Sequence, residues 1–154
     1  MVRELKVTPI RNGTVIDHLP AGSALGICQV LGIPRPGSAS TVSVVMNVPS
    51  DAMGHKDIIK VEDRDLHEDA QQQLAVMAPN ATVNTIRDYH VSEKRTPEAP
   101  ETVKNLAACP NPGCITNDEE PVSSEFDVHR NGDGYELSCA FCVERIEDPI
   151  ELVG

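Results

Sequence analysis

Four cysteines lie in the sequence Cys109-Pro-Asn-Pro-Gly-Cys114, followed by twenty-four residues and then by Cys139-Ala-Phe-Cys142, and the C-terminal part of the chain is organised around them. Each pair of cysteines is a short chelating loop that brings two sulfurs within reach of one ion, and two such loops complete a tetrahedron of thiolates. Proline presets the backbone of the first loop, and glycine accepts a positive φ there. The pattern predicts one structural zinc ion per chain, held by Cys109, Cys114, Cys139 and Cys142.

Two other roles for these cysteines fit the sequence less well. A pair of disulfides would suit an oxidising compartment, but no signal peptide points to one, and we expect the chain to be cytoplasmic. A redox-active Cys-x-x-Cys motif belongs beside a βαβ pattern, which the surrounding sequence does not resemble. With four protein ligands the zinc would have no open position, so we expect the site to hold structure and not to catalyse.

The charge of the chain is unevenly distributed along its 154 residues. The formal net charge is −11; residues 1–100 carry 12 acidic and 10 basic side chains, whereas residues 101–154 carry 12 acidic and 3 basic ones. The cysteine-rich part would therefore repel a phosphate backbone, which favours a protein partner over nucleic acid. An acidic surface with few lysines also resembles proteins of salt-loving organisms, where dense salt screens self-repulsion. No apolar run is long enough to span a bilayer, so no membrane association is expected.

Strand and helix patterns alternate along the first hundred residues. Alternating or β-branched apolar positions predict strands, with a hairpin turn at Asn12-Gly13 between the first two. Apolar residues at helical spacing predict a helix over residues 23–32, and a capping box at residues 65–68 predicts a second helix that ends before Pro79. The predicted strands cover residues 5–10, 14–19, 41–48, 57–61, 81–86 and 89–92.

These elements predict an α+β fold in two domains. Two helices against one antiparallel sheet make a sandwich close to the ferredoxin-like pattern. A Pro-rich charged segment at residues 95–101 predicts the boundary, so the first domain covers residues 1–97 and the second residues 98–154. The second domain is too short for a robust core and needs zinc for stability. We expect it to be a small zinc ribbon of the rubredoxin type.

The sequence shows no catalytic constellation. It has no P-loop, no Gly-x-Ser-x-Gly and no pair of carboxylates to which a role can be assigned. Asp17 and His18 form one polar pair inside a predicted strand, and such a pair is by itself more often structural than functional. Lys60 and Lys94 end predicted strands, and each taken singly is expected to be a solvated surface charge. Cys28 is expected to be a buried core residue of the first helix.

Five segments stand out when the chain is taken as a whole, namely Gly13-Thr-Val-Ile-Asp-His-Leu-Pro20, Met53-Gly-His-Lys-Asp-Ile-Ile-Lys60, Ala81-Thr-Val-Asn-Thr-Ile86, Cys109-Pro-Asn-Pro-Gly-Cys114 and Glu120-Pro-Val-Ser-Ser124. In this order they resemble the regulatory chain of aspartate carbamoyltransferase. The resemblance runs over nearly the whole chain. The main departures lie in the first predicted helix and in the loop at residues 34–40.

The resemblance implies an N-terminal domain that binds nucleotide effectors and a C-terminal zinc domain that docks on a catalytic chain. It implies that Asp17, His18, Lys60 and Lys94 are nucleotide-binding positions, and two lysines from separate strands can converge on a triphosphate. A base needs apolar walls for its faces and amide or backbone partners for its edge. The positions that the resemblance implies for base and ribose are Val7, Ile10, Asn84, Ile86, Tyr89 and Val91.

The function that the resemblance implies is that of a non-catalytic regulatory subunit in pyrimidine biosynthesis. Regulatory chains would pair as homodimers that bridge catalytic trimers, with CTP and ATP, and UTP as a further candidate, as effectors. The coupling would be a difference in nucleotide affinity between two quaternary states. Two alternatives are a nucleic-acid-binding zinc-ribbon protein, which the acidic C-terminal region disfavours, and a stand-alone enzyme on the ferredoxin-like domain, which turnover by the purified chain would reveal.

Overall fold

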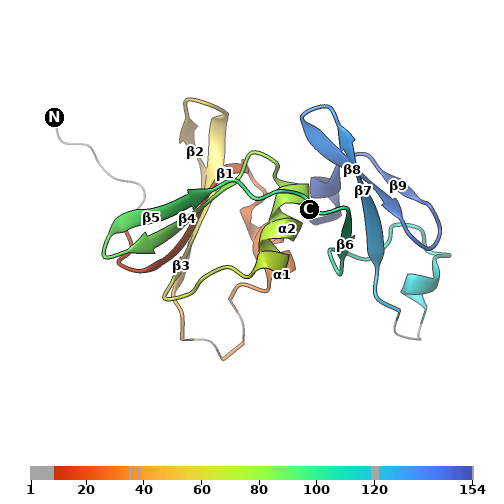
Figure 1. Cartoon of the computed structure of the whole chain (residues 1–154), viewed down its shortest axis with the longest axis horizontal. Coiled ribbons are helices and arrows are strands. Elements are labelled where there is room, and N and C mark those ends of the chain that lie inside the picture. Colours follow the sequence, from red (N-terminus) through yellow and green to blue (C-terminus); the bar gives the residue numbers. More distant parts are fainter. Residues whose placement is uncertain (1–8, 35, 38, 119–121, 154) are drawn as a thin grey trace.

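The computed structural model of the chain describes residues 9–34, 36–37, 39–118 and 122–153 (Figure 1). Val7 and most of the strand predicted at residues 5–10 lie outside the described residues. A five-stranded sheet and a four-stranded sheet stand on either side of two helices, which therefore lie between the sheets. No helix in the described ranges is long and apolar enough to cross a membrane.

The first unit is an antiparallel sheet with two helices on one face. Its strands lie in the order β2-β3-β1-β4-β5, with β1 paired to both β3 and β4. The first four strands have the ferredoxin-like arrangement, and β5 adds an edge strand beside β4. This confirms the predicted fold class. The elements are β1 (Gly13–Pro20), α1 (Ala24–Leu31), β2 (Val42–Ser50), β3 (Gly54–Glu62), α2 (Glu68–Met77), β4 (Thr82–Arg87) and β5 (His90–Arg95).

The hairpin turn predicted at Asn12-Gly13 is wrong. Gly13 is the first residue of β1, and the carbonyl of Asn12 accepts a hydrogen bond from the backbone N–H of Asp63 at 3.0 Å. Gly13 has a φ of 140°, and a Cβ there would lie 2.1 Å from the carbonyl oxygen of Val61. Glycine is therefore required at this position because the backbone of β1 approaches β3 closely. The same residue, after an asparagine, gives the sequence pattern of a hairpin turn.

The helices bury the faces that their sequences predict. In α1 the buried residues are Ala24, Ile27, Cys28 and Leu31, which confirms Cys28 as a core residue, and burial raises the pKa of its thiol. The capping box predicted at residues 65–68 is wrong, because α2 begins at Glu68 after His67 without a side-chain cap. The carboxylate of Asp65 is instead held by the Arg87 guanidinium, at 2.9 and 3.0 Å.

A buried carboxylate joins β3 to the start of α1 and to the edge strand β2. Asp57 is fully buried and accepts hydrogen bonds from the backbone N–H groups of Ala24 at 2.9 Å and Asn47 at 2.8 Å. Ala24 begins α1, where a negative charge is favourable next to the helix dipole. Asn47, with a φ of 59°, lies in a bulge of β2. Asp57 therefore fixes the first helix and the edge strand to the centre of the sheet.

The second unit is a four-stranded antiparallel sheet in the order β6-β7-β8-β9. Its core is small, with Phe126 and Leu137 fully buried. The C-terminal 3₁₀ helix η2 packs against α1 and α2, and the buried side chains of the two units form one continuous cluster. The elements are β6 (Thr102–Lys104), η1 (Ile115–Asn117), β7 (Glu125–Asn131), β8 (Gly134–Cys139), β9 (Arg145–Ile146) and η2 (Pro149–Val153).

Candidate functional site

The four predicted cysteine ligands come together at one end of the second unit. Cys109 and Cys114 flank the loop before η1, Cys139 ends β8, and Cys142 lies in the turn before β9. Their sulfurs all lie within 4.8 Å of one another, at 3.5 Å for Cys109 and Cys142 and 3.7 Å for Cys114 and Cys139. A tetrahedral zinc with Zn–S bonds of about 2.3 Å requires sulfurs about 3.8 Å apart. A disulfide requires about 2.05 Å, so the geometry fits a metal ion and not two disulfides.

Side chains around the first cysteine loop hold its backbone in place. The Asn117 amide donates hydrogen bonds to the carbonyls of Cys109 at 2.9 Å and Asn111 at 2.8 Å. The hydroxyl of Thr116 lies 3.2 Å from the sulfur of Cys114. Such outer contacts orient metal ligands before the ion binds. Sequence reasoning missed Asn117 and Thr116, whose proximity in the chain to Cys114 is the only signal that could have found them.

The thiols differ strongly in acidity. Burial raises the pKa of Cys109 to about 12 and also raises the pKa of Cys139, whereas hydrogen bonds from Thr116 lower the pKa of Cys114 to about 7. A buried thiolate needs a compensating cation, which a zinc ion among four sulfurs would supply. The donor set therefore suits a structural metal site, as the sequence predicts.

Exposed apolar residues are direct chain neighbours of the cysteines. Ile115, Phe141 and Val143 each follow or precede a cysteine of the cluster and are 50%, 47% and 76% exposed; we call these three residues the metal-end patch. Val143 has a φ of 56°, a region that a β-branched residue rarely adopts. Its N–H donates to the carbonyl of Cys139 at 3.0 Å, so the loop itself requires this backbone conformation. A glycine would adopt this backbone conformation without strain, and the exposed valine side chain packs little against the described residues.

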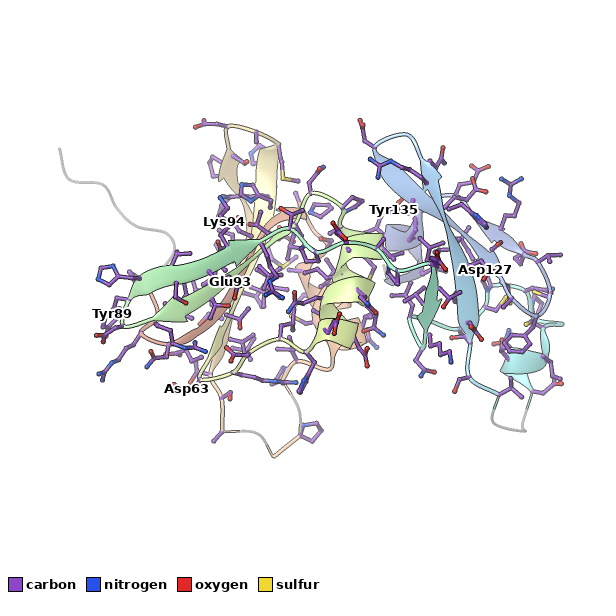
Figure 2. All side chains as sticks on the ribbon, viewed as in Figure 1. Asp63, Tyr89, Glu93, Lys94, Asp127 and Tyr135 are labelled. Carbon is purple, nitrogen blue, oxygen red and sulfur yellow. The ribbon has the colours of Figure 1, made fainter. Side chains whose placement is uncertain are left out.

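Three predicted nucleotide-binding residues share one row across the first sheet. Lys60 on β3 lies opposite Val15 on β1, Val15 lies opposite Asn84 on β4, and Asn84 lies opposite Lys94 on β5. Residues paired in this way point to the same face. That face is turned away from the helices, and we call it the outer face (Figure 2). Three strand spacings place the Cα atoms of Lys60 and Lys94 roughly 14 Å apart. Lys60 lies two residues before the end of β3 and Lys94 one residue before the end of β5, so both are near strand ends as predicted, and the pairing adds that they share one row across the sheet.

The two lysines of this row differ in environment. Lys94 is exposed, as expected, whereas Lys60 is only 3% exposed, so the expectation of a solvated charge is wrong for Lys60. Burial lowers the pKa of Lys60, and the carboxylate of Glu62 on the same strand opposes that shift. A buried lysine retains its charge at neutral pH only where anionic groups compensate for lost solvation.

The Asp17–His18 pair lies on the outer face at a bulge in β1. The pairing between β1 and β3 shifts between Ile16 and Leu19, and His18 has a φ of 61°. Asp17 accepts the backbone N–H of His18 at 2.6 Å and forms an ion pair with Lys56 at 3.0 Å. Ile16 before the bulge and Leu19 after it are both fully buried on the helix side of the sheet. The two residues between them, Asp17 and His18, therefore both lie on the outer face. Sequence reasoning missed Lys56, which only the folded register brings next to Asp17.

Four of the remaining predicted positions, Ile10, Ile86, Tyr89 and Val91, lie near the Gly13 end of β1. Ile86 lies opposite both Gly13 and Val91, and the N–H of Tyr89, in the turn between β4 and β5, donates to the carbonyl of Arg11 at 2.9 Å. Ile10, next to Arg11, and Ile86 are each 7% exposed, whereas Val91 and Tyr89 are 58% and 62% exposed. Tyr89 lies at the tip of the β4–β5 hairpin, at the opposite end of β5 from Lys94 (Figure 2).

The chain is thus a two-domain protein, in which an α+β domain with a polar outer face precedes a domain with a four-cysteine metal cluster. Two family models match the chain: "Aspartate carbamoyltransferase regulatory chain, allosteric domain" over residues 5–98, and "Aspartate carbamoyltransferase regulatory chain, metal binding domain" over residues 101–150. The chain belongs to the family of aspartate carbamoyltransferase regulatory chains.

Relatives with that name are similar over most of their length. The chain is 46% identical over 148 residues to the regulatory chain of Methanocella arvoryzae, covering 96% of this chain and 94% of the relative. It is 45% identical over 148 residues to that of Haloarcula marismortui, with 96% and 92% covered. It is 50% identical over 140 residues to that of Haloquadratum walsbyi, with 91% and 76% covered.

Family membership fixes the coarse function. The chain is a regulatory and not a catalytic subunit of an enzyme of pyrimidine biosynthesis, and it therefore has a catalytic chain as its partner. Its C-terminal part is a metal-binding domain, and the four clustered cysteines fit one structural zinc ion. The salt-loving sources of some relatives agree with the acidic composition.

Proposed function

We propose that the chain binds nucleoside triphosphates on the outer face of the five-stranded sheet and thereby controls a catalytic chain docked on the metal domain. The observation that carries this proposal is the row Lys60, Asn84 and Lys94, in which two cations flank an amide on one face of a chain with net charge −11. Lysine ammonium groups on flexible stems can converge on a triphosphate and form charge-assisted hydrogen bonds.

The order of residues along β1 suggests how a nucleotide would lie. At the level of Gly13 the face is apolar, with Ile86 and Val91 as walls for a base, and Val7, Ile10 and Tyr89 complete the proposed set. At the level of Val15 are the lysines and Asn84. At the level of Asp17 are His18 and Lys56. Successive levels are two residues apart, roughly 7 Å, so base, ribose and phosphates can each meet a different level.

We infer that the metal domain carries the contact to the catalytic chain. Its zinc would be held by Cys109, Cys114, Cys139 and Cys142, and the metal-end patch supplies apolar anchors of the kind that interfaces bury. The acidic charge of residues 101–154 favours a partner surface with basic residues and disfavours nucleic acid. A reducing, cytoplasmic compartment would keep the thiols available for zinc.

Isothermal titration calorimetry on the zinc-loaded full-length chain tests the nucleotide site. CTP, ATP and UTP are each titrated at fixed ionic strength, because salt screens the phosphate contacts. We expect saturable binding of the triphosphates and much weaker binding of cytidine and adenosine, which lack phosphates. Absence of triphosphate binding would refute the proposal, and retention of the chain on duplex DNA at moderate salt would revive the nucleic-acid alternative.

The oligomeric state and the domain limits stay predictions. The resemblance implies a homodimer of regulatory chains, and sedimentation of the zinc-loaded chain measures it directly. A domain boundary near residue 97 predicts that limited proteolysis cuts between β5 and β6. Cleavage elsewhere in preference to that segment would contradict the boundary.

A further inference from the structure

His18 is held at only one of its ring nitrogens among the described residues. Its Nδ1 lies 3.1 Å from the hydroxyl oxygen of Thr82 on β4. Thr82 lies opposite Asp17 and two residues from Asn84, so its side chain is on the outer face. The bulge at Asp17 and His18 is what brings the imidazole to that hydroxyl. The Thr82 hydroxyl therefore faces the polar level of the proposed nucleotide site.

The groups around Thr82 leave its hydroxyl proton available for donation to His18. The side-chain nitrogen of Asn84 lies 3.3 Å from the carbonyl of Val15 and 3.5 Å from the hydroxyl oxygen of Thr82. The Val15 carbonyl can only accept, so it identifies this end of the amide as the NH₂ group. Thr82 then accepts from Asn84 and still has one proton to donate, and His18 Nδ1 is positioned to accept it. In a neutral imidazole an accepting Nδ1 leaves the proton on Nε2.

We propose that Thr82 is a positioning residue that holds His18 in the Nε2–H tautomer, so that the imidazole donates a hydrogen bond to an oxygen of the bound nucleotide. The proposal rests on the proposed nucleotide site. The opposite tautomer would present a lone pair to that oxygen and repel it. Because phosphate and ribose oxygens are both acceptors, the experiment must separate the two.

The tautomer is measured by ¹⁵N NMR of histidine-labelled, zinc-loaded full-length chain without nucleotide, at alkaline pH where imidazoles are neutral. We expect a protonated Nε2 and an unprotonated Nδ1 for His18. Thr82→Val removes the donor but keeps the β-branched shape, and it should give mixed tautomers. Thr82→Ser should restore the parent spectrum. The matched control is Ser138→Ala, which removes the hydroxyl 3.0 Å from His129 Nε2 and should leave His18 unchanged.

The role in binding is measured by titrating the same variants with CTP and with cytidine. Loss of one neutral hydrogen bond predicts about 2- to 12-fold weaker CTP binding by Thr82→Val, and parent affinity for Thr82→Ser and Ser138→Ala. A loss for CTP alone assigns the His18 donor to phosphate, and an equal loss for cytidine assigns it to ribose. A protonated Nδ1 in the parent chain, or undiminished CTP binding by Thr82→Val, would overturn the proposal.

If the parent chain bound no nucleotide, both the proposed function and the proposed role of Thr82 in nucleotide binding would be refuted. The NMR result would still report separately whether Thr82 orients His18, because it is measured without nucleotide. Thermal unfolding of each variant checks that the fold is retained. A Thr82→Val chain that unfolds is replaced by a comparison of Thr82→Ser with Thr82→Ala under the same two readouts.

Discussion

The five-stranded and four-stranded sheets reach stability by different means. The first buries aliphatic side chains such as Ile16, Ile59 and Leu74 beneath two helices. The second has few large buried side chains, Phe126 and Leu137 among them, and gathers four cysteines at one end. A small sheet with so little buried apolar area is marginal unless a metal ion adds its binding energy. In the proposed function, ligand binding belongs to the sheet that is stable without a metal, and docking belongs to the sheet that depends on one.

The two units nevertheless share a boundary that is not polar. The helix η2 at the C-terminal end packs against α1 and α2, and the buried cluster is continuous from one sheet to the other. The first unit would therefore lose some packing if the second unfolded, but it would keep the face of its sheet on which the proposed nucleotide site lies. The following changes separate the two units, in order of decreasing effect.

Removal of the metal should have the largest effect. Structural zinc contributes about 10–16 kcal/mol of apparent binding free energy in small zinc domains, so Cys139→Ser or chelation should unfold the four-stranded sheet. The five-stranded sheet should remain largely folded. Hydrogen exchange should show lost protection in β7 and β8 and retained protection in β1 and β3. A matched control is Cys28→Ser, which removes the thiol that lies outside the metal cluster. Protected β7 and β8 amides in zinc-free protein would contradict the account.

Loss of Asp57 should have the converse effect on the first unit. Asp57→Ala removes two charge-assisted hydrogen bonds and leaves two backbone N–H groups buried, which predicts a destabilisation of about 3 kcal/mol or more. The variant should still bind one zinc per chain. Denaturant unfolding monitored in each sheet measures this, with exposed Asp51→Ala on the same hairpin as control. Equal stability of the two variants would show that the hydrogen bonds of Asp57 contribute nothing to stability.

Loss of Lys94 should affect ligand binding and not stability. One charge-assisted contact is worth about 1.5–3 kcal/mol, so Lys94→Ala should weaken triphosphate binding by roughly 10- to 150-fold. Binding of the bare nucleoside should barely change. Calorimetry measures both, and Lys104→Ala, an exposed lysine on β6, is the control. Equal losses for triphosphate and nucleoside would make Lys94 structural, and high salt should reduce the triphosphate loss.

Replacement of Val143 by glycine should have the smallest effect. It should raise the stability of the zinc domain and weaken its binding to the catalytic chain. A left-handed backbone is strained for valine, so Val143→Gly should stabilise the zinc domain by about 0.5–1 kcal/mol. It also removes an exposed anchor, so it should weaken binding to the catalytic chain several-fold. Asn105→Gly, at another exposed residue with positive φ, controls for the backbone effect. Unchanged docking by Val143→Gly would remove Val143 from the interface.

Local patterns predicted much of this molecule from sequence. The cysteine spacing predicts the cluster because chelating loops are formed by residues close in the chain, and the spacing of Ala24, Ile27 and Leu31 predicts the buried face of α1. The turn at Asn12-Gly13 and the capping box at residues 65–68 fail for one reason, since both local signals are overridden by partners distant in sequence. Gly13 is needed against Val61, and Asp65 is taken by Arg87.

The parts that sequence missed depend on register. Lys56 meets Asp17, Thr82 meets His18, and Asp57 meets Ala24 only after strands and helix are placed, and no pattern within a segment contains these pairs. The alignment of Lys60, Asn84 and Lys94 is of the same kind. The resemblance to a known family named these last three residues, and the strand pairing gives the physical reason that they can act together.

We propose that nucleotide binding on the first sheet controls a catalytic chain held by the second unit. The decisive measurement is the rate of carbamoyl transfer against aspartate concentration in the complex reconstituted with its catalytic chain, with and without CTP or ATP. We expect nucleotide to shift the half-saturating aspartate concentration in the parent complex and to leave it unchanged in a Lys94→Ala complex of the same composition. A parent complex that does not respond, or a Lys94→Ala complex that responds equally at the same low nucleotide concentration, would contradict this proposal.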